Sequence, residues 1–249
     1  MLIRIRILTI LILSIALNSC GKNSHHAPYI LTTATTGGTY YPVGVALATI
    51  TKANLYNTHG ISLSAISSAG SLENIKLLRE NQAQFALLQG IFAAWAWNGD
   101  GPIDKPQKWL RSIAALWPNA DHFVIKKNLT STNTIMTLNQ LNGERFVLGA
   151  RNSGAEKTGE YILNSLGIDF SKKLNLAFMN YGATANAIQD GTISGMNIPA
   201  GVPVASISRA FAVLGNELTL LEFTDTHLKK INAKYPLWSR YIIPTNTYP

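Results

Sequence analysis

The sequence predicts an α/β protein with mainly parallel sheets, and three observations support this fold class. Strand-like and helix-like runs alternate, as where the run at 29–33 is followed by a helical pattern starting near Pro42. The turns between them are short and rich in Gly, Ser and Thr. With 249 residues, 47% of them hydrophobic, the chain can form one large lobe or two small ones. Such alternation implies parallel strands, whose ligands bind at the carboxyl ends, where these turns lie.

Composition and charge exclude two classes of protein. Only 14% of the residues are charged, so the chain is not intrinsically disordered. The formal net charge is +8, but Arg4 and Arg6 lie in the leader and the other basic residues are scattered. Nucleic-acid binding needs a clustered basic stripe, so no nucleic-acid partner is expected. The positive balance favours acidic solutes or envelope surfaces instead.

Residues 1–20 have the pattern of a secretory signal peptide. The basic start is followed by an apolar run at 7–17 that is too short for a comfortable membrane span. Leu17-Asn18-Ser19-Cys20 resembles a bacterial lipobox, although Asn18 departs from the small or aliphatic residue usual there. Cys20 is the only cysteine, so an intrachain disulfide is impossible. We expect Cys20 to be lipidated; the alternative is a signal cut elsewhere, with Cys20 incidental.

Residues 21–27 are short and polar and are expected to form a flexible tether. His25 and His26 are adjacent there, but no third ligand lies nearby in the sequence. Because a zinc site needs three or four ligands, no metal site is expected.

The first small-residue turn, Thr35–Pro42, has the parts of an anion site. Gly37 and Gly38 lack a Cβ, so the backbone can turn sharply and approach a ligand closely. Thr36 and Thr39 can cap the following helix or donate hydroxyls. The first turn of that helix leaves N–H groups unpaired, which suits a carboxylate. A plain strand-to-helix turn is the alternative. No Gly-Lys-Ser/Thr follows, so the turn is not a nucleotide-binding loop.

The same order of strand, turn and helix repeats at 61–81. A strand at 61–66 is followed by a turn at 67–71 and a helix at 72–81, with Ser71 as its expected N-cap. A short buried strand at 85–88 then ends at Gln89-Gly90. Further on we expect strands at 110–116 and 122–125, joined at Trp117-Pro118. They are followed by a helix and turn at 137–145 and by a strand at 146–149 that opens a second lobe.

A second candidate ligand turn lies at 150–156. Ser153 and Glu156 have the spacing of a capping box, which is a sufficient structural reason for both. The functional interpretation is that Ser153 and Gly154 face the first Gly-Gly turn across a cleft. Arg151 either binds a carboxylate through its two-pronged guanidinium or lies in solvent.

The remaining chain continues the α/β pattern. A helix at 161–166 ends at Gly167, a strand follows at 174–179, and Tyr181 begins a turn. A Gly/Pro loop is expected at 197–203, before a helix at 204–211. A last strand is expected at 218–223.

These segments resemble, in order, the TAXI family of TRAP-transporter solute receptors. Thr36-Gly37-Gly38-Thr39-Tyr40-Tyr41-Pro42-Val43-Gly44 resembles the opening signature of that family. The resemblance continues, collinearly, at 69–74, 86–89, 95–99, 137–145, 153–156, 190–203 and 241–249.

This chain departs from the family pattern at several points. Gln89-Gly90-Ile91 stands where the family has Gln-Ser-Asp, so a polar group near the cleft is missing. Ala155 replaces a Thr, and Ser194-Gly195-Met196 replaces an Asp-Ala segment. In the family a second inter-lobe crossing follows the final Thr-Tyr-Pro, whereas this sequence stops at Pro249. We therefore expect that crossing, and the C-terminal part of lobe 1, to be missing.

The resemblance implies a two-lobed type II periplasmic-binding-protein fold, with lobe 1 at 28–120 and lobe 2 at 121–249. It implies an extracytoplasmic, periplasmic lipoprotein that captures glutamate, glutamine or 2-oxoglutarate for a TRAP-type membrane permease. The ligand residues are expected to be Thr36, Gly37, Gly38, Thr39, Tyr40, Gly70, Ser71, Gln89, Arg151, Ser153, Gly154, Tyr181 and Pro199.

Two other functions are alternatives to capture of a solute. A truncated paralogue without transport function is the main alternative, because of the missing crossing. A secreted enzyme is less favoured, since no Gly-x-Ser-x-Gly is present and no acid–base pair stands out. No catalytic residue and no cofactor are therefore expected, and the isolated His59, His122 and His227 are expected to be structural or exposed.

Overall fold

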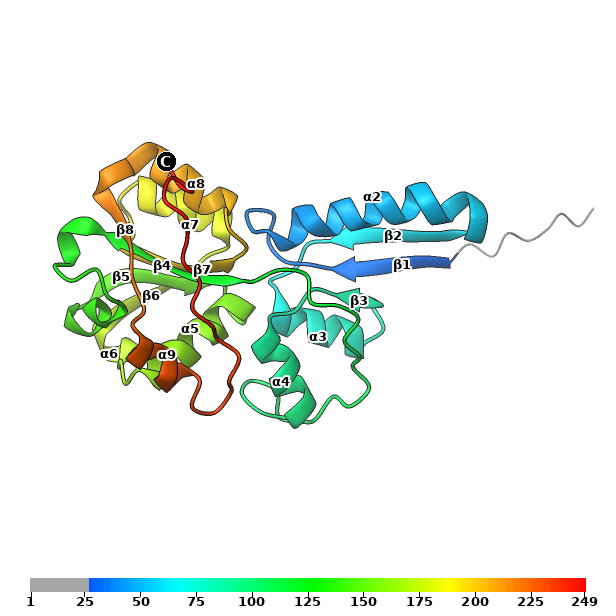
Figure 1. The fold of residues 1–249 in the computed structure, drawn as a ribbon, viewed down its shortest axis with the longest axis horizontal. Coiled ribbons are helices and arrows are strands. Elements are labelled where there is room, and N and C mark those ends of the chain that lie inside the picture. The colour runs from blue at the N-terminus through cyan, green and yellow to red at the C-terminus, as the bar shows by residue number, and fades with distance from the viewer. Residues whose placement is uncertain (1–26) are drawn as a thin grey trace, which may run out of the picture.

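Two α/β lobes lie side by side in the computed structural model, which describes residues 27–249 (Figure 1). The expected lipidation of Cys20 and nearly all of the tether lie outside the described residues. Within them the strands form a three-stranded sheet, ordered β2-β1-β3, and a five-stranded sheet, ordered β6-β5-β7-β4-β8.

Lobe 1 follows the strand–helix alternation that the sequence predicts. Its elements are β1 (Ala27–Thr32), α2 (Tyr40–His59), β2 (Ile61–Ile66), α3 (Ser71–Arg79), β3 (Phe85–Ala86) and α4 (Gly90–Asn98). The strands of its sheet are parallel. Buried Asn74 on α3 holds their carboxyl ends together: its Oδ1 accepts from Thr32 Oγ1 at 2.7 Å, and its Nδ2 donates to the carbonyls of Thr33 and Leu87.

Lobe 2 contains a mixed sheet, not the mainly parallel one expected. Its strands are β4 (Ala120–Lys126), β5 (Glu144–Gly149), β6 (Leu174–Phe178), β7 (Gly195–Ala200) and β8 (Leu218–Leu220). Its helices are α5 (Gly154–Ser165), α6 (Phe170–Lys173), α7 (Tyr181–Gln189), α8 (Ala205–Leu214) and α9 (Asp225–Ile231), with short 3-10 turns at Lys127–Leu129, Ile135–Gln140 and Gly215–Glu217. Strands β5, β6 and β7 are parallel, whereas β4 runs antiparallel to β7 and β8.

Each face of the second sheet carries its own apolar cluster. Phe123, Phe146 and Leu148 point to one face, where they pack with α5 and the turn after β4. Val124, Val147 and Met196 point to the other face, against α7 and α8. Because neighbouring residues in a strand point to opposite faces, burial on both sides explains the nearly continuous apolar runs in β4 and β5.

Several expected boundaries were wrong. The Gly/Pro loop expected at 197–203 starts inside β7, where Pro199 pairs with Asp121 of β4. β7 pairs with β5 only at Gly195 and Met196, so one side of Pro199 has no neighbouring strand and its missing N–H is tolerated. The strand expected at 110–116 is an irregular connection with largely exposed side chains. There is a 3-10 turn in place of the helix expected from residue 137, and α2 begins at Tyr40 rather than Pro42.

The segment after α9 contacts both lobes. The ring of Tyr235 lies in the apolar cluster of lobe 1 with Phe92 and Trp95. The indole of Trp238 stacks on Tyr161 of lobe 2, with ring centroids 5.3 Å apart. Figure 1 shows the last residues running back across lobe 2 towards α8.

Candidate functional site

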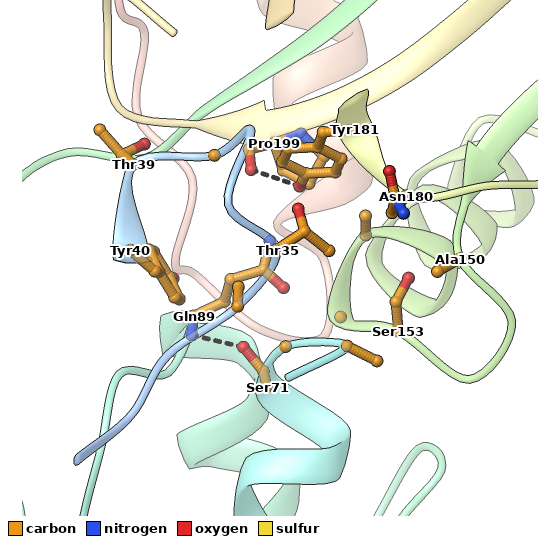
Figure 2. A pocket seen from close by; sticks show the side chains of 16 residues that line it. Thr35, Thr39, Tyr40, Ser71, Gln89, Ala150, Ser153, Asn180, Tyr181 and Pro199 are labelled. Carbon is orange, nitrogen blue, oxygen red and sulfur yellow. Dashed lines mark hydrogen bonds between the residues drawn. The ribbon is translucent and has the colours of Figure 1, made fainter. Parts of the chain in front are cut away.

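A pocket lies between the two lobes, at the carboxyl ends of the parallel strands (Figure 2). Its cavity volume is about 30 Å³. The residues that line it are Ala34, Thr35, Gly38, Thr39, Tyr40, Ala69, Gly70, Ser71, Gln89, Ala150, Ser153, Gly154, Ala155, Asn180, Tyr181 and Pro199. They come from both lobes, so the pocket is formed where the lobes meet.

The Gly-Gly turn brings the backbone of lobe 1 against lobe 2. A Cβ at Gly38 would lie 3.2 Å from two carbons of the Tyr181 ring. Beside it, the N–H of Gly201 donates to Thr39 Oγ1 at 2.7 Å, across the two lobes. A larger residue at position 38 would press on the Tyr181 ring, so glycine suits this close approach.

Ser71 and Gln89 form the floor of the pocket in lobe 1 (Figure 2). The N–H of Gln89 donates to Ser71 Oγ at 3.0 Å, and Thr158 Oγ1 of lobe 2 donates to Gln89 Oε1 at 2.9 Å. Ser71 was expected to cap α3, but Gly70 occupies the N-cap position, with a φ of 116° that glycine adopts readily. The Ser71 hydroxyl instead holds the turn that precedes α4.

In the second ligand turn, at 150–156, Ser153 both caps α5 and lines the pocket. Ser153 is 2% exposed, and its Oγ accepts from the N–H of Glu156 at 3.1 Å. The Glu156 carboxylate accepts from the N–H of Asn152 rather than from that of Ser153, so only half of the expected capping box is present. The Ser153 side chain still lines the pocket.

Five helices within residues 27–249 begin at the pocket, and their N-termini supply its electrostatic character. Lining residues stand at or next to the first residue of α2, α3, α4, α5 and α7, namely Tyr40, Ser71, Gln89, Gly154 and Tyr181. Helix N-termini carry partial positive charge and unpaired N–H groups. None of the described lining residues is Lys, Arg, His, Asp or Glu. The arrangement favours an anion held by backbone and hydroxyl donors.

Two tyrosines at the pocket remain protonated donors. Burial raises the pKa of the Tyr40 hydroxyl, and the Asp121 carboxylate adds to that increase. Burial also raises the pKa of Tyr181, with further contributions from Tyr40 and Asp121. The Tyr181 hydroxyl donates to the carbonyl of Pro199 at 2.8 Å (Figure 2). Neither phenol is therefore available as a base near neutral pH.

The structure brings together ten of the thirteen expected ligand residues. Thr36, Gly37 and Arg151 do not line the pocket. Thr36 is exposed, and the Arg151 guanidinium lies over the Phe178 ring, 3.9 Å from its centroid. Sequence reasoning missed Ala34, Thr35, Ala69, Ala150, Ala155 and Asn180. Each lies within or next to a predicted turn, so proximity to these turns was the available signal.

Two absences within the described residues concern metal binding and membrane crossing. No group of three or more His, Cys, Asp or Glu residues in 27–249 could hold a metal ion. Within the same range, no helix combines the length and hydrophobicity needed to cross a membrane.

A family model described as NMT1-like family matches residues 31–249. The chain belongs to the NMT1-like family. Among solved structures, this NMT1-like protein resembles a Bordetella bronchiseptica RB50 protein with a TM-score of 0.53 and 13% identity, over 83% of this chain and 60% of that one. This likeness, at low identity, concerns the fold.

Two further solved structures carry names that describe binding. The periplasmic aliphatic sulphonate binding protein SsuA from Escherichia coli gives a TM-score of 0.47 and 13% identity, over 78% of this chain and 56% of that one. An amino acid ABC transporter substrate-binding protein from Streptococcus pneumoniae, bound to L-arginine, gives a TM-score of 0.48 and 12% identity, over 80% of this chain and 77% of that one. This chain thus spans little more than half the length of SsuA. The expected two-lobed α/β architecture is confirmed by the two separate sheets and the helices that cover them.

Proposed function

We propose that this NMT1-like protein is an extracytoplasmic solute-binding protein that holds a small carboxylate between its lobes. The observation that carries this proposal is the convergence of five helix N-termini on one pocket without a charged lining side chain. A carboxylate accepts hydrogen bonds but donates none, which matches a site built of N–H and hydroxyl donors. The lining residues include no acid or base for catalysis, so binding and release are proposed rather than a reaction.

The proposed mechanism is closure of the lobes over the ligand. Backbone N–H groups at the starts of α3 and α5 would donate to the carboxylate, together with the hydroxyls of Thr35 and Ser153. Hydrogen bonds to a charged group contribute about 1.5–3 kcal/mol each. The direct contacts between lobes, at Thr39–Gly201 and Thr158–Gln89, then stabilise the closed state.

The finer details of the proposal come from the resemblance to TAXI receptors. They comprise glutamate, glutamine or 2-oxoglutarate as ligand, a TRAP-type permease as partner, a periplasmic location, and lobes that meet near residue 120. The extended connection before β4 and the change of sheet at Ala120 support that boundary.

Replacing Ser153 by Ala tests the carboxylate site. The change removes one donor to a charged group and should weaken binding by about 1.5–3 kcal/mol, measured by calorimetry with a panel of carboxylates. Thr36→Ala is the matched control, because Thr36 is exposed outside the pocket. Because Ser153 also caps α5, thermal unfolding of both variants should be measured alongside. Tight binding of a neutral sugar, with no response to any carboxylate, would refute the proposal.

Membrane anchoring is a separate part of the proposal and has its own test. If Cys20 carries a lipid, Cys20→Ala should release the protein from the membrane fraction or block its processing. Fractionation followed by mass spectrometry of the N-terminus measures both. An unchanged distribution between membrane and soluble fractions would show that Cys20 is not the anchor.

A further inference from the structure

The pocket offers no counter-charge for a second ionic group. All sixteen described residues that line it are neutral. The helix N-termini and hydroxyls can hold one carboxylate, but a second carboxylate or an ammonium group would enter the cleft without a partner. Burying an unpaired charge is strongly unfavourable in a protein interior. The lining therefore discriminates by ligand charge.

Carboxylates lie close to the pocket, together with basic side chains such as Arg151, which is adjacent to the lining residue Ala150. Glu73 and Glu156 lie in the first turns of α3 and α5, where each accepts from a loop N–H at 2.5 Å. Asp121 lies close enough to contribute to the raised pKa values of two pocket tyrosines, whose main cause is burial. Lys157 on α5 pairs with Glu160 at 3.0 Å and with Glu156 at 3.5 Å. These carboxylates offset part of the positive potential of the helices, which disfavours a dianion.

Two hydroxyls at the pocket retain donors that no described residue uses. Thr35 Oγ1 is buried and has no hydrogen-bond partner within residues 27–249. Ser153, almost fully buried, accepts from Glu156 through its oxygen, which leaves its proton free within the described chain. Figure 2 shows the two side chains on different lobes, Thr35 on the turn after β1 and Ser153 on the turn before α5. Two donors match the two oxygens of a single carboxylate.

The cavity also limits the length of the ligand. Its volume of about 30 Å³ leaves little free space between the lobes in this arrangement. The lobes touch directly around it, since a Cβ at Gly154 would lie 3.2 Å from the backbone N of Ser71. A five-carbon diacid therefore needs more widening of the cleft than a two- or three-carbon acid does.

We propose that the pocket selects short, singly charged carboxylates with an uncharged body, such as acetate, propionate or pyruvate, over dicarboxylates and amino acids. This inference rests on the proposed function, because it concerns the same pocket. It differs from the resemblance, which implies glutamate, glutamine or 2-oxoglutarate.

Calorimetry with the full processed protein tests the selectivity. Acetate, propionate and pyruvate are compared with succinate, 2-oxoglutarate, alanine and glutamate at neutral pH and fixed salt. The best short monocarboxylate should bind roughly tenfold tighter than any doubly charged ligand or zwitterion. Equal or tighter binding of 2-oxoglutarate or glutamate would overturn this inference and leave carboxylate capture standing. Binding of no carboxylate at all would overturn both.

A charge added to the pocket wall provides an independent readout. Ala150 lines the pocket and is half-buried, so a long side chain can be accommodated there. Ala150→Lys should raise the ratio of succinate affinity to propionate affinity about fivefold or more, because the ammonium supplies the missing counter-charge. Ala150→Gln is the neutral control of similar length and should leave that ratio near the wild-type value. The same ratio in both variants would contradict the charge argument.

Discussion

Asp121 and His122 are adjacent residues of β4 with opposite electrostatic responses. Trp238 Nε1 donates to Asp121 Oδ2 at 2.9 Å. His122 Nδ1 lies 2.9 Å from the Ile198 carbonyl, which can only accept, so Nδ1 carries the proton and Nε2 accepts from the Tyr248 hydroxyl at 2.8 Å. Burial raises the pKa of Asp121 to about 6 and lowers the pKa of His122 to about 4. The fold therefore favours the neutral form of both.

These two shifts predict compensating pH dependences of stability. The contribution of Asp121 is present below its ordinary pKa of 3.8 and is lost as pH rises through about 6. The contribution of His122 is present above its ordinary pKa of 6.5 and is lost as pH falls through about 4. Across this shared window the two changes oppose each other, so together they give the wild-type protein little net slope.

Single substitutions should reveal the separate pH dependence that each of the two residues gives to stability. In Asp121→Asn the free energy of unfolding should fall, relative to wild type, as pH is lowered from about 6.5 to 4. In His122→Gln the free energy of unfolding should fall, relative to wild type, as pH is raised from about 4 to 6. Urea unfolding at a series of pH values measures both slopes. Parallel pH profiles for the two variants and wild type would contradict the assignment.

Helices α2 and α5 differ clearly in how many of their residues are buried against the rest of the protein. Of the twenty described residues in α2, Gly44 alone is buried, whereas seven of the twelve described residues in α5 are buried. A Cβ at Gly44 would lie 2.5 Å from the Thr33 methyl, so the helix contacts the sheet closely at this point. Val43, Leu47 and Ile50 recur at helical spacing in the sequence, which predicts one shared helix face, yet Ile50 is 60% exposed. The pattern identified the helix correctly, but it did not show how little of that face would be covered.

This difference predicts unequal protection from hydrogen exchange. Amides in the second half of α2, at 50–59, should exchange at least about tenfold faster than those of α5 at 158–165, because fewer apolar contacts oppose local opening. Exchange followed by mass spectrometry measures the ratio within one sample, so α5 serves as the internal reference. Equal protection of both helices would show that α2 is stabilised by more than its described contacts.

At the scale of the whole molecule, an aromatic cluster of Trp95, Tyr161, Tyr235 and Trp238 joins the lobes. Trp95 meets Tyr161 edge to face, with ring centroids 5.8 Å apart. The Tyr235 hydroxyl donates to Asp100, which also forms an ion pair with Lys234. A residue from the segment after α9 thus packs into lobe 1, although the sequence-based division assigned it to lobe 2.

Truncation of this cluster should loosen the closed state. Tyr235→Ala removes a ring that is 8% exposed and should lower the free energy of unfolding by about 3 kcal/mol. It should also weaken ligand binding, since the lobes would close with less support. Tyr241→Ala, at a position that is 47% exposed, is the matched control and should change stability by less than about 0.5 kcal/mol. Denaturant unfolding and calorimetry would measure both effects; equal losses in the two variants would count against a role for Tyr235 between the lobes.

The sequence by itself determined the order of strands, small-residue turns and helices. Periodicity, capping spacing and turn composition are local properties, so the strand at 61–66 was predicted at its observed bounds and Ser153 was identified as a cap. The same local signals located most pocket residues, because parallel strands bring their following turns to one edge. Local pattern failed where tertiary pairing decides the outcome, as at Pro199, which joins β7 because β4 lies beside it.

Only the tertiary structure decided which turns meet and how closely. Thr39 and Gly201 are 162 positions apart, and Gln89 and Thr158 are 69 apart, yet each pair forms a hydrogen bond between the lobes. Asp121 and Trp238, 117 positions apart, are paired in the same way. Such contacts depend on how two separately packed lobes and the final segment fit together, and no local periodicity encodes that fit. The small, uncharged cavity follows from this fit, because its walls come from both lobes.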